Sequence, residues 1–254
     1  MSAQPPGASG VVCFLHAFPL SAGMWAEQVA AVRDAGWTAI APNFPGFGGE
    51  PIGDAHSLDD FARFLTPHLR GLPEPPVVVG LSMGGYVAFR LLEQGLTVRG
   101  LILADTKATP DTPQAAEKRL AAASRAEREG VTWALAEVIP GLLSPGVAPS
   151  TLRRAQALAS EATPEGFANA QRAMAARPDS QAVLRGVIAP ALILVGEHDK
   201  MTGLAEAEAM TAILPPTAKL GVIQDAGHLS NLENPVTFNA RLLEFLDALG
   251  ARRR

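Results

Sequence analysis

Cysteine is nearly absent from this chain: Cys13 is the only one among 254 residues. A single cysteine excludes an internal disulfide, and nothing in the cysteine usage indicates an oxidising compartment. Cys13 lies within the apolar run VVCFL at residues 11–15. We therefore interpret it as a small buried hydrophobic residue and not as a nucleophile.

Long apolar runs and an excess of positive charge are missing as well. No stretch approaches the roughly 18 continuous apolar residues of a membrane-spanning helix, and residues 1–10 lack the basic and apolar regions of a signal peptide. The net charge of −4 argues against a nucleic-acid partner, and we expect the basic cluster Arg252–Arg254 to be a solvated tail. We therefore expect a cytoplasmic protein, monomeric or homodimeric, with neither a membrane nor a nucleic acid as partner.

Short apolar runs instead alternate with segments of helical periodicity. The runs predict strands at 11–15, 37–42, 76–80, 98–105 and 190–196, and a sixth strand with its exit loop at 218–227. Helical patterns occupy 22–36, 57–72, 85–95, 205–214 and 235–250. Strands that are apolar on both faces and joined by helices are typical of a parallel sheet covered by helices. The sequence thus predicts an α/β fold with a mostly parallel sheet flanked by helices.

Residues 106–188 interrupt this alternation. They contain helical patterns at 113–130 and 164–177, joints rich in proline and glycine such as 140–150, and no convincing strand. We therefore predict a core domain made of residues 1–105 and 189–254, and a helical cap, 106–188, inserted between two strands over the carboxyl edge of the sheet.

The segment VVVGLSMGGYVAF, Val77–Phe89, places Ser82 between a predicted strand and a predicted helix. A G-x-S-x-G pattern in this context is the nucleophile elbow, a turn so tight that small residues are needed on either side of the serine. The serine hydroxyl would stand at a helix N-terminus, where the dipole favours developing negative charge. A glycine-rich turn that merely packs tightly would show the same pattern, so the motif alone is weak.

A serine nucleophile needs a base, and the base needs a carboxylate to orient it. Of the five histidines, His228 is the best candidate because it follows the last predicted strand in a glycine-containing loop. Two aspartates follow neighbouring strands, Asp105 after the fourth and Asp199 after the fifth. Both fit the chain order of nucleophile, acid and histidine, and either could instead cap a helix or brace a loop.

Five segments occur in one order: FLHAFPLSAGMW, NFPGFG, GLSMGG, LVGEHDKMT and AGHLSNLENP. Over nearly its whole length the sequence resembles the α/β-hydrolase superfamily, in its serine hydrolase branch of carboxylesterases and 3-oxoadipate enol-lactonases. The resemblance implies that Ser82 is the nucleophile, His228 the base and Asp199, in preference to Asp105, the acid. It argues against haloalkane dehalogenases and epoxide hydrolases, which use an aspartate nucleophile.

The same resemblance implies an oxyanion hole formed by the backbone N–H groups of Phe18 and Met83. Ala17 replaces a glycine of the family, which requires that residue 17 not need a positive φ. His16 would then be structural, fixing this loop. Asn43 stands where an aspartate is common, which we interpret as a packing detail.

The substrate pocket is predicted to be apolar. Phe18, Leu20 and Leu229 lie near the oxyanion and histidine segments, and Trp133 of the cap is a candidate wall residue, with packing inside the cap as its alternative. Lys107 could meet an acidic group of a substrate, although a solvated lysine is the simpler interpretation. We therefore expect short acyl or aromatic esters in preference to highly charged substrates.

From these residues we predict a serine hydrolase that cleaves a small-molecule carboxylic ester or lactone through an acyl-enzyme, with no metal or organic cofactor. A carbon–carbon bond hydrolase, a thioesterase or a cofactor-free perhydrolase would use the same three residues. A non-catalytic binding protein of the same fold is the remaining alternative.

Overall fold

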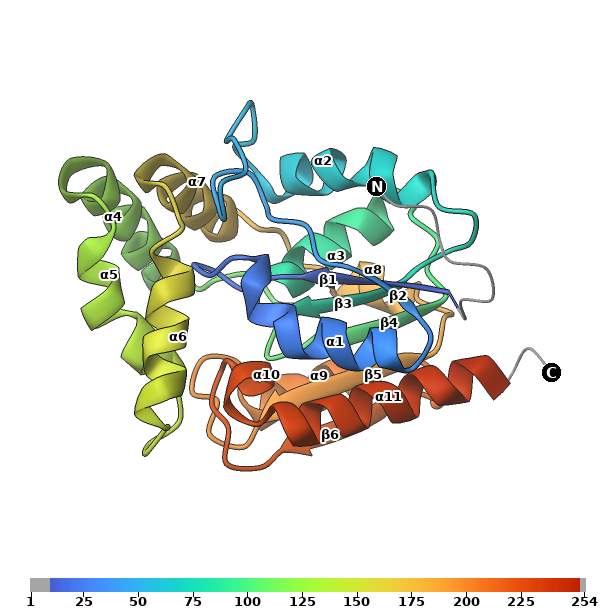
Figure 1. Ribbon diagram of the computed structural model, residues 1–254. Coiled ribbons are helices and arrows are strands. Elements are labelled where there is room, and N and C mark those ends of the chain that lie inside the picture. Colours follow the sequence, from blue (N-terminus) through green and yellow to red (C-terminus); the bar gives the residue numbers. More distant parts are fainter. Residues whose placement is uncertain (1–9, 252–254) are drawn as a thin grey trace.

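A computed structural model describes residues 10–251 (Figure 1). The predicted tail Arg252–Arg254 and most of the N-terminal segment examined for a signal peptide lie outside the described residues. Six strands form one parallel sheet in the order β2-β1-β3-β4-β5-β6, which confirms the predicted α/β architecture. The strands are β1 (Val11–Leu15), β2 (Thr38–Ile40), β3 (Val77–Leu81), β4 (Gly100–Ala104), β5 (Ala191–Gly196) and β6 (Lys219–Ile223).

The four central strands are buried along their whole length, as their continuous apolar runs predict. The edge strands β2 and β6 are partly exposed. The sixth strand, expected together with its exit loop at 218–227, spans Lys219–Ile223, and the chain turns at Asp225, whose φ is 56°. Residues 224–227 of this range belong to the loop that leads to His228.

Helices cover both faces of the sheet (Figure 1). Alternate side chains of each strand point to opposite faces, so Val12 and Phe14 join one core cluster while Cys13 and Leu15 join the other. One face is covered by η1 (Ala22–Trp25), α1 (Ala26–Asp34) and α11 (Pro235–Ala251), and the other by α2 (Leu58–Arg70), α3 (Met83–Glu93), α8 (Gln181–Arg185) and α9 (Leu204–Ile213).

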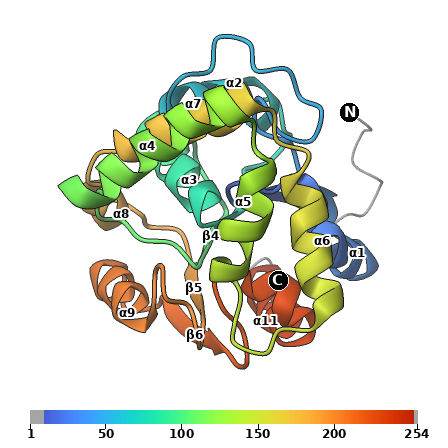
Figure 2. The same cartoon turned by 90° about the vertical axis from the view of Figure 1, so that its left-hand side faces the viewer.

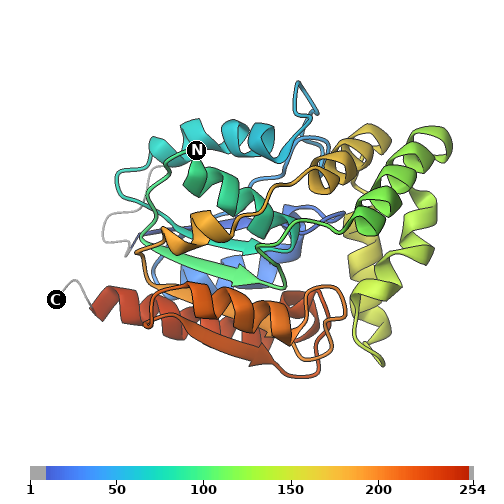
Figure 3. The same ribbon diagram turned by 180° about the vertical axis from the view of Figure 1, so that it is seen from behind.

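Between β4 and β5 the chain forms helices and no strand. Figure 2 shows α4 and α7 side by side, and in Figure 3 the arrowheads of the strands point toward this helical layer. The last helix of the segment, α8, instead packs beside α3 and α9 at the sheet. The layer consists of α4 (Pro113–Glu129), α5 (Thr132–Glu137), η2 (Ile139–Leu142), α6 (Pro149–Ala159) and α7 (Pro164–Ala175).

The division into a core domain of residues 1–105 and 189–254 and a cap of residues 106–188 stays a prediction. Within residues 10–251, no helix combines the length and the apolar character that crossing a membrane requires.

Candidate active site

Ser82 occupies a strained turn between β3 and α3, with φ 54° and ψ −115°. A Cβ atom on Gly80 would lie 2.5 Å from the Gly84 carbonyl oxygen, and one on Gly84 would lie 2.0 Å from the carbonyl oxygen of Leu15. Both distances are shorter than any real van der Waals contact. The glycines are therefore required by close backbone approach, as the elbow pattern predicts.

The loops after β3, β5 and β6 bring three of the predicted residues together. His228 Nε2 lies 2.8 Å from Ser82 Oγ, and His228 Nδ1 lies 2.9 Å from Asp199 Oδ2. All three residues are buried, with exposures between 4% and 8%, so bulk water competes little for these hydrogen bonds. Asp105, the alternative acid, is hydrogen-bonded to Gly196 and Ser230 and not to the histidine.

The Asp199 carboxylate accepts further hydrogen bonds from its own loop. Its Oδ1 accepts the backbone N–H groups of Met201 and Thr202 at 2.7 and 3.1 Å, and its Oδ2 accepts the Thr202 hydroxyl at 2.7 Å. Burial by itself would raise the pKa of Asp199, but the hydrogen bond and charge of His228 and the bonds from Thr202 and Met201 outweigh it and lower the pKa to about 2. The carboxyl group is therefore ionised at neutral pH.

The pKa of His228 shifts in the opposite direction to that of Asp199. Burial lowers its pKa, but the hydrogen bond and negative charge of Asp199 outweigh burial, and the net pKa is raised. The arrangement therefore favours a positive charge on this imidazole, which a general base acquires when it accepts a proton.

The oxyanion segment lies at the same edge of the sheet. Met83 is the first residue of α3, and the N–H of a first helical residue has no acceptor inside its own helix. Phe18 follows β1, whose last residue touches Gly84. Among the described residues other than glycine, positive φ occurs at Ser82, Asp105 and Asp225. Ala17 therefore has a negative φ, and an alanine can replace the glycine of the family here without backbone strain.

His16 braces this loop from inside. Its Nδ1 lies 3.0 Å from the Ala17 carbonyl oxygen, and its Nε2 accepts the Phe44 N–H at 3.0 Å. Both contacts fit a neutral ring with the proton on Nδ1, and burial, partly opposed by the Ala17 bond, lowers the pKa to about 4. Asn43 bridges the next loop, because its Oδ1 accepts the Ala22 N–H and its Nδ2 donates to the Gly48 carbonyl.

An aromatic row joins the oxyanion loop to the helical layer. The ring centres of Phe18 and Phe167 of α7 are 4.6 Å apart, and those of Phe167 and Trp133 of α5 are 5.7 Å apart. Trp133 is half-buried and donates its Nε1–H to the Gly130 carbonyl. Leu20 and Leu229 are completely buried among core side chains, whereas Phe18 keeps 7% exposure. Substrate contact by these four predicted residues stays a prediction.

A buried ion-pair network lies beside the first turn of α3. The Asp111 carboxylate binds Arg177 at 2.8 Å and Arg119 at 2.6 Å, and the Arg177 guanidinium stacks 4.3 Å from the ring centre of Tyr86. Burial would raise the pKa of Asp111, but the two arginines outweigh it and lower the pKa. Lys107, the sequence candidate for an acidic substrate group, is half-buried and takes no part in these contacts.

Contacts between loops hold the histidine in place. The His228 N–H donates to the Leu142 carbonyl at 2.8 Å, and the Glu233 carboxylate accepts the N–H groups of Ser144 and Gly227 at 2.7 and 2.9 Å. These bonds tie the end of η2 to the loop between β6 and α10 (Ser230–Glu233). The end of η2 and the candidate base are therefore fixed relative to each other.

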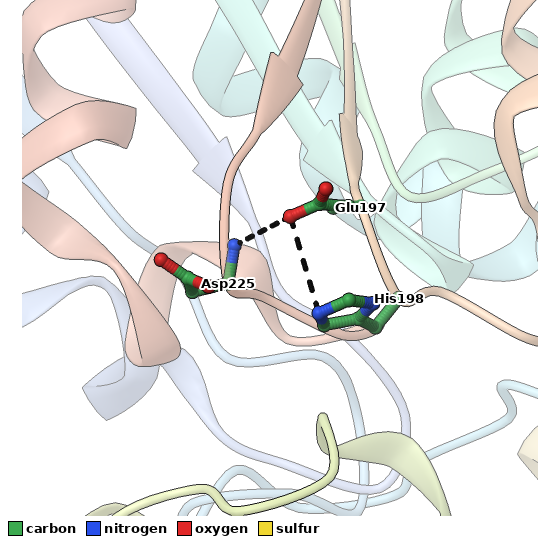
Figure 4. Close-up of side chains that lie close together, drawn as sticks. All are labelled: Glu197, His198 and Asp225. Atoms are coloured by element: carbon green, nitrogen blue, oxygen red, sulfur yellow. Dashed lines mark hydrogen bonds and ion pairs between the residues drawn. The ribbon is translucent and has the colours of Figure 1, made fainter.

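A second group of titratable side chains lies on the surface next to these loops (Figure 4). Glu197 Oε2 accepts the Asp225 N–H at 3.1 Å and lies 3.9 Å from His198 Nε2. One potential ligand atom from each residue lies within 4.8 Å of the others, so the three could approach a cation, but all are exposed and Glu197 already binds a backbone amide. Two of them also line a polar hollow of about 260 Å³, formed by Ser144, Pro145, Gly146, Val147, Ala148, Thr151, His198, Asp225 and Glu233.

Three residues of this region are absent from the sequence-based prediction: Thr202, Phe167 and Glu233. Thr202 follows Asp199 by three positions, a spacing at which an aspartate commonly binds the following backbone and hydroxyl groups, so its contact could have been anticipated. Phe167 and Glu233 carry no comparable local signal, because their contacts depend on how distant segments pack.

Comparison with known proteins adds to this geometry. Residues 14–241 match the model of the alpha/beta hydrolase family. A thermophilic esterase from Thermogutta terrifontis, in a malate-bound structure, is 36% identical with a TM-score of 0.89, covering 96% of this chain and 92% of its own. The 3-oxoadipate enol-lactonase 1 of Acinetobacter baylyi is 28% identical over 92% of this chain and 87% of its own length. Non-heme chloroperoxidase CPO-A1 of Kitasatospora aureofaciens is 40% identical over 76 residues only, which span 29% of this chain and 28% of that protein.

Proposed function

The chain belongs to the alpha/beta hydrolase family, and from this premise we propose that it is a serine hydrolase that cleaves a carboxylic ester or a lactone. One observation carries the proposal: the continuous hydrogen-bonded row from Ser82 Oγ through the His228 ring to Asp199. A nucleophile, a base and an orienting carboxylate in this order are the requirements of acyl transfer by a serine enzyme.

In the proposed reaction, His228 Nε2 accepts the hydroxyl proton while Ser82 Oγ attacks the carbonyl carbon. Asp199 holds the Nδ1–H and stabilises the imidazolium that forms. The N–H groups of Phe18 and Met83 donate to the oxyanion, and one such donor is typically worth about 3 kcal/mol. The imidazolium then protonates the leaving alcohol, and a water deprotonated by His228 hydrolyses the acyl-enzyme.

We propose that residues 106–188 form a cap that limits the size of the substrate. The aromatic row of Phe18, Phe167 and Trp133 favours an apolar acyl or aryl group next to the oxyanion loop. The names of two relatives, an esterase and an enol-lactonase, support an ester or a lactone as the bond that is cleaved.

The test compares wild type with Ser82→Ala on p-nitrophenyl acetate and butyrate, together with labelling by a fluorophosphonate probe. Loss of an activated nucleophile typically costs at least about 1,000-fold in kcat, so we expect the variant to be inactive and unlabelled. Ser160→Ala, which removes an exposed hydroxyl at the end of α6, is the matched control and should keep full activity and labelling. Substantial turnover or labelling of Ser82→Ala would exclude this serine as the nucleophile.

A cofactor-free perhydrolase is the second candidate, favoured by the local 40% identity to a non-heme chloroperoxidase. In that reaction hydrogen peroxide takes the place of water in attacking the acyl-enzyme. A panel of esters of graded chain length, enol-lactones, and acetate with hydrogen peroxide separates the two candidates. Peroxide-dependent oxidation faster than ester hydrolysis would favour the second.

A further inference from the structure

Three consecutive residues at the end of β4 hold the three segments that carry the candidate triad. The Ala104 carbonyl accepts the Ser82 N–H at 3.0 Å, and the Thr106 hydroxyl donates to the Ser82 carbonyl at 2.9 Å. Both polar groups of the Ser82 backbone are thus bound by residues on either side of Asp105. The nucleophile elbow is fixed to β4 at this point.

Asp105 itself binds the other two segments. Its Oδ1 accepts the Gly196 N–H at 2.7 Å, and its Oδ2 is hydrogen-bonded to the Ser230 hydroxyl. Gly196 precedes the candidate acid Asp199 by three residues, and Ser230 follows His228 by two. A single carboxyl group therefore joins the end of β5, from which the Asp199 loop starts, to the start of α10, which directly follows the His228 loop.

The backbone at this position indicates that the contact is specific. Asp105 has a φ of 45°, a left-handed conformation that side-chain-bearing residues rarely adopt, and it is 1% exposed. Strained backbone of this kind persists only where surrounding contacts hold it, and it is concentrated at functional sites. In this conformation the carboxyl group of Asp105 is hydrogen-bonded to Gly196 and Ser230.

We propose that Asp105 is a positioning residue, which fixes the acid-bearing and histidine-bearing loops in the alignment that Ser82 needs. The proposal rests on the serine hydrolase function proposed above. The carboxyl group of Asp105 binds Gly196 and Ser230 and not the side chains of Ser82 or His228, so in this proposal it acts through the positions of Asp199 and His228. Misplacement of a catalytic group by about 1 Å can cost on the order of 100-fold in rate, which is the size of effect that such a residue controls.

The charges around Asp105 agree with this role. The titratable groups that influence it are Asp199 in the loop after β5 and His228 in the loop after β6. Burial, together with the negative charge of Asp199, raises the pKa of Asp105 to about 8. The charge of His228 and the hydrogen bonds from Ser230 and Gly196 oppose this rise, so Asp105 shares one buried electrostatic environment with the acid and the histidine.

The experiment measures kcat on p-nitrophenyl butyrate for each active site, with active sites counted by the fluorophosphonate probe. Asp105→Ala removes both loop contacts, and we expect kcat per labelled site to fall by 10- to 100-fold with KM changed less. Asp105→Asn keeps an acceptor for the Gly196 N–H and replaces the acceptor of the Ser230 hydroxyl by an amide N–H that donates to the Ser230 oxygen, and it should restore most of the lost rate. Leu101→Ala, at the buried start of the same strand, is the control for lost stability and should keep kcat per labelled site.

The two proposals fail in different ways. If the wild type neither reacts with the probe nor cleaves any ester, the serine hydrolase function is wrong. If the wild type is labelled and active, but Asp105→Ala keeps the wild-type kcat per labelled site, Asp105 only stabilises the fold and this inference is overturned. An equal fall in kcat for Asp105→Ala and Leu101→Ala would overturn it as well.

Discussion

The replacement Asp105→Asn should stabilise the protein, and by an amount that depends on pH. The folded state holds the pKa of Asp105 at about 8, whereas the ordinary value of an aspartate is 3.8. At a pH between these two values, Asp105 holds a proton in the folded protein and has lost it in the unfolded chain. Folding stability of the wild type therefore falls as pH rises through this window.

The size of the effect follows from the separation of the two pKa values. Each pH unit inside this window changes the free energy of unfolding by about 1.4 kcal/mol, and the two pKa values lie about four units apart. Because the side chain is buried, little solvent screening reduces this figure. An asparagine carries no charge at any pH and keeps hydrogen bonds with Gly196 and Ser230. The variant therefore avoids the free-energy cost of burying an ionised carboxylate.

Urea unfolding, followed by tryptophan fluorescence at intervals from pH 4.5 to 8.5, gives the free energy of unfolding of both proteins. We expect the advantage of Asp105→Asn to widen by up to about 1.4 kcal/mol per pH unit up to pH 8 and then to stay constant. The same change at the exposed Asp54 controls for the loss of one charge. A difference between wild type and Asp105→Asn that does not vary with pH would refute the reasoning, because it would mean that Asp105 ionises alike in both states.

Three further predictions concern His228, Gly84 and Asp111. Because a protonated imidazole cannot accept the serine proton, kcat/KM should fall as pH drops through the raised pKa of His228; a pH–rate profile whose acidic limb lies below pH 6.5, the ordinary value, would contradict this. Gly84→Ala should destabilise the fold by about 3 kcal/mol, since its Cβ would overlap the Leu15 carbonyl, whereas Gly141→Ala, with open space around it, should leave the melting temperature nearly unchanged. Asp111→Asn should lower the free energy of unfolding by about 3 kcal/mol in urea titrations at pH 7, because it removes the counter-charge of two arginines; an unchanged midpoint would show that the pairs contribute nothing.

Some features of the site could be predicted because they are local. The glycines around Ser82 are close together in the sequence, and the contact that requires Gly80 is made by Gly84, four residues away, so the pattern is visible locally even though Gly84 itself is required by the distant Leu15. The buried strands were predicted because burial on both faces requires a continuous apolar run. The ends of strands were predicted less well: the run at 37–42 forms a strand only over Thr38–Ile40, because a strand extends only as far as its pairing with a neighbour, here β1.

The choice between Asp199 and Asp105 shows where this reasoning stops. Both residues follow strands that end at one edge of the sheet, so their spacing from Ser82 and His228 is equally suitable, and only the family resemblance favoured Asp199. In the structure, the carboxyl group of Asp105 binds Gly196 and Ser230, while the loop after β5 places Asp199 beside the imidazole. The direction that each loop takes cannot be predicted from the residue types, because both candidates are aspartates that follow a buried strand.

The sequence alone determined the alternation of strands and helices, the tight turn at the serine and the residue types available for acyl transfer, because each depends on neighbours along the chain. Only the tertiary structure decided which side chains meet. Ser82 and His228 are 146 positions apart and Asp105 and Ser230 are 125 apart, and these pairs come together because parallel pairing places the ends of β3, β4, β5 and β6 at one edge. Contacts over such separations depend on the order of strands and the direction of loops, which local physical chemistry does not specify.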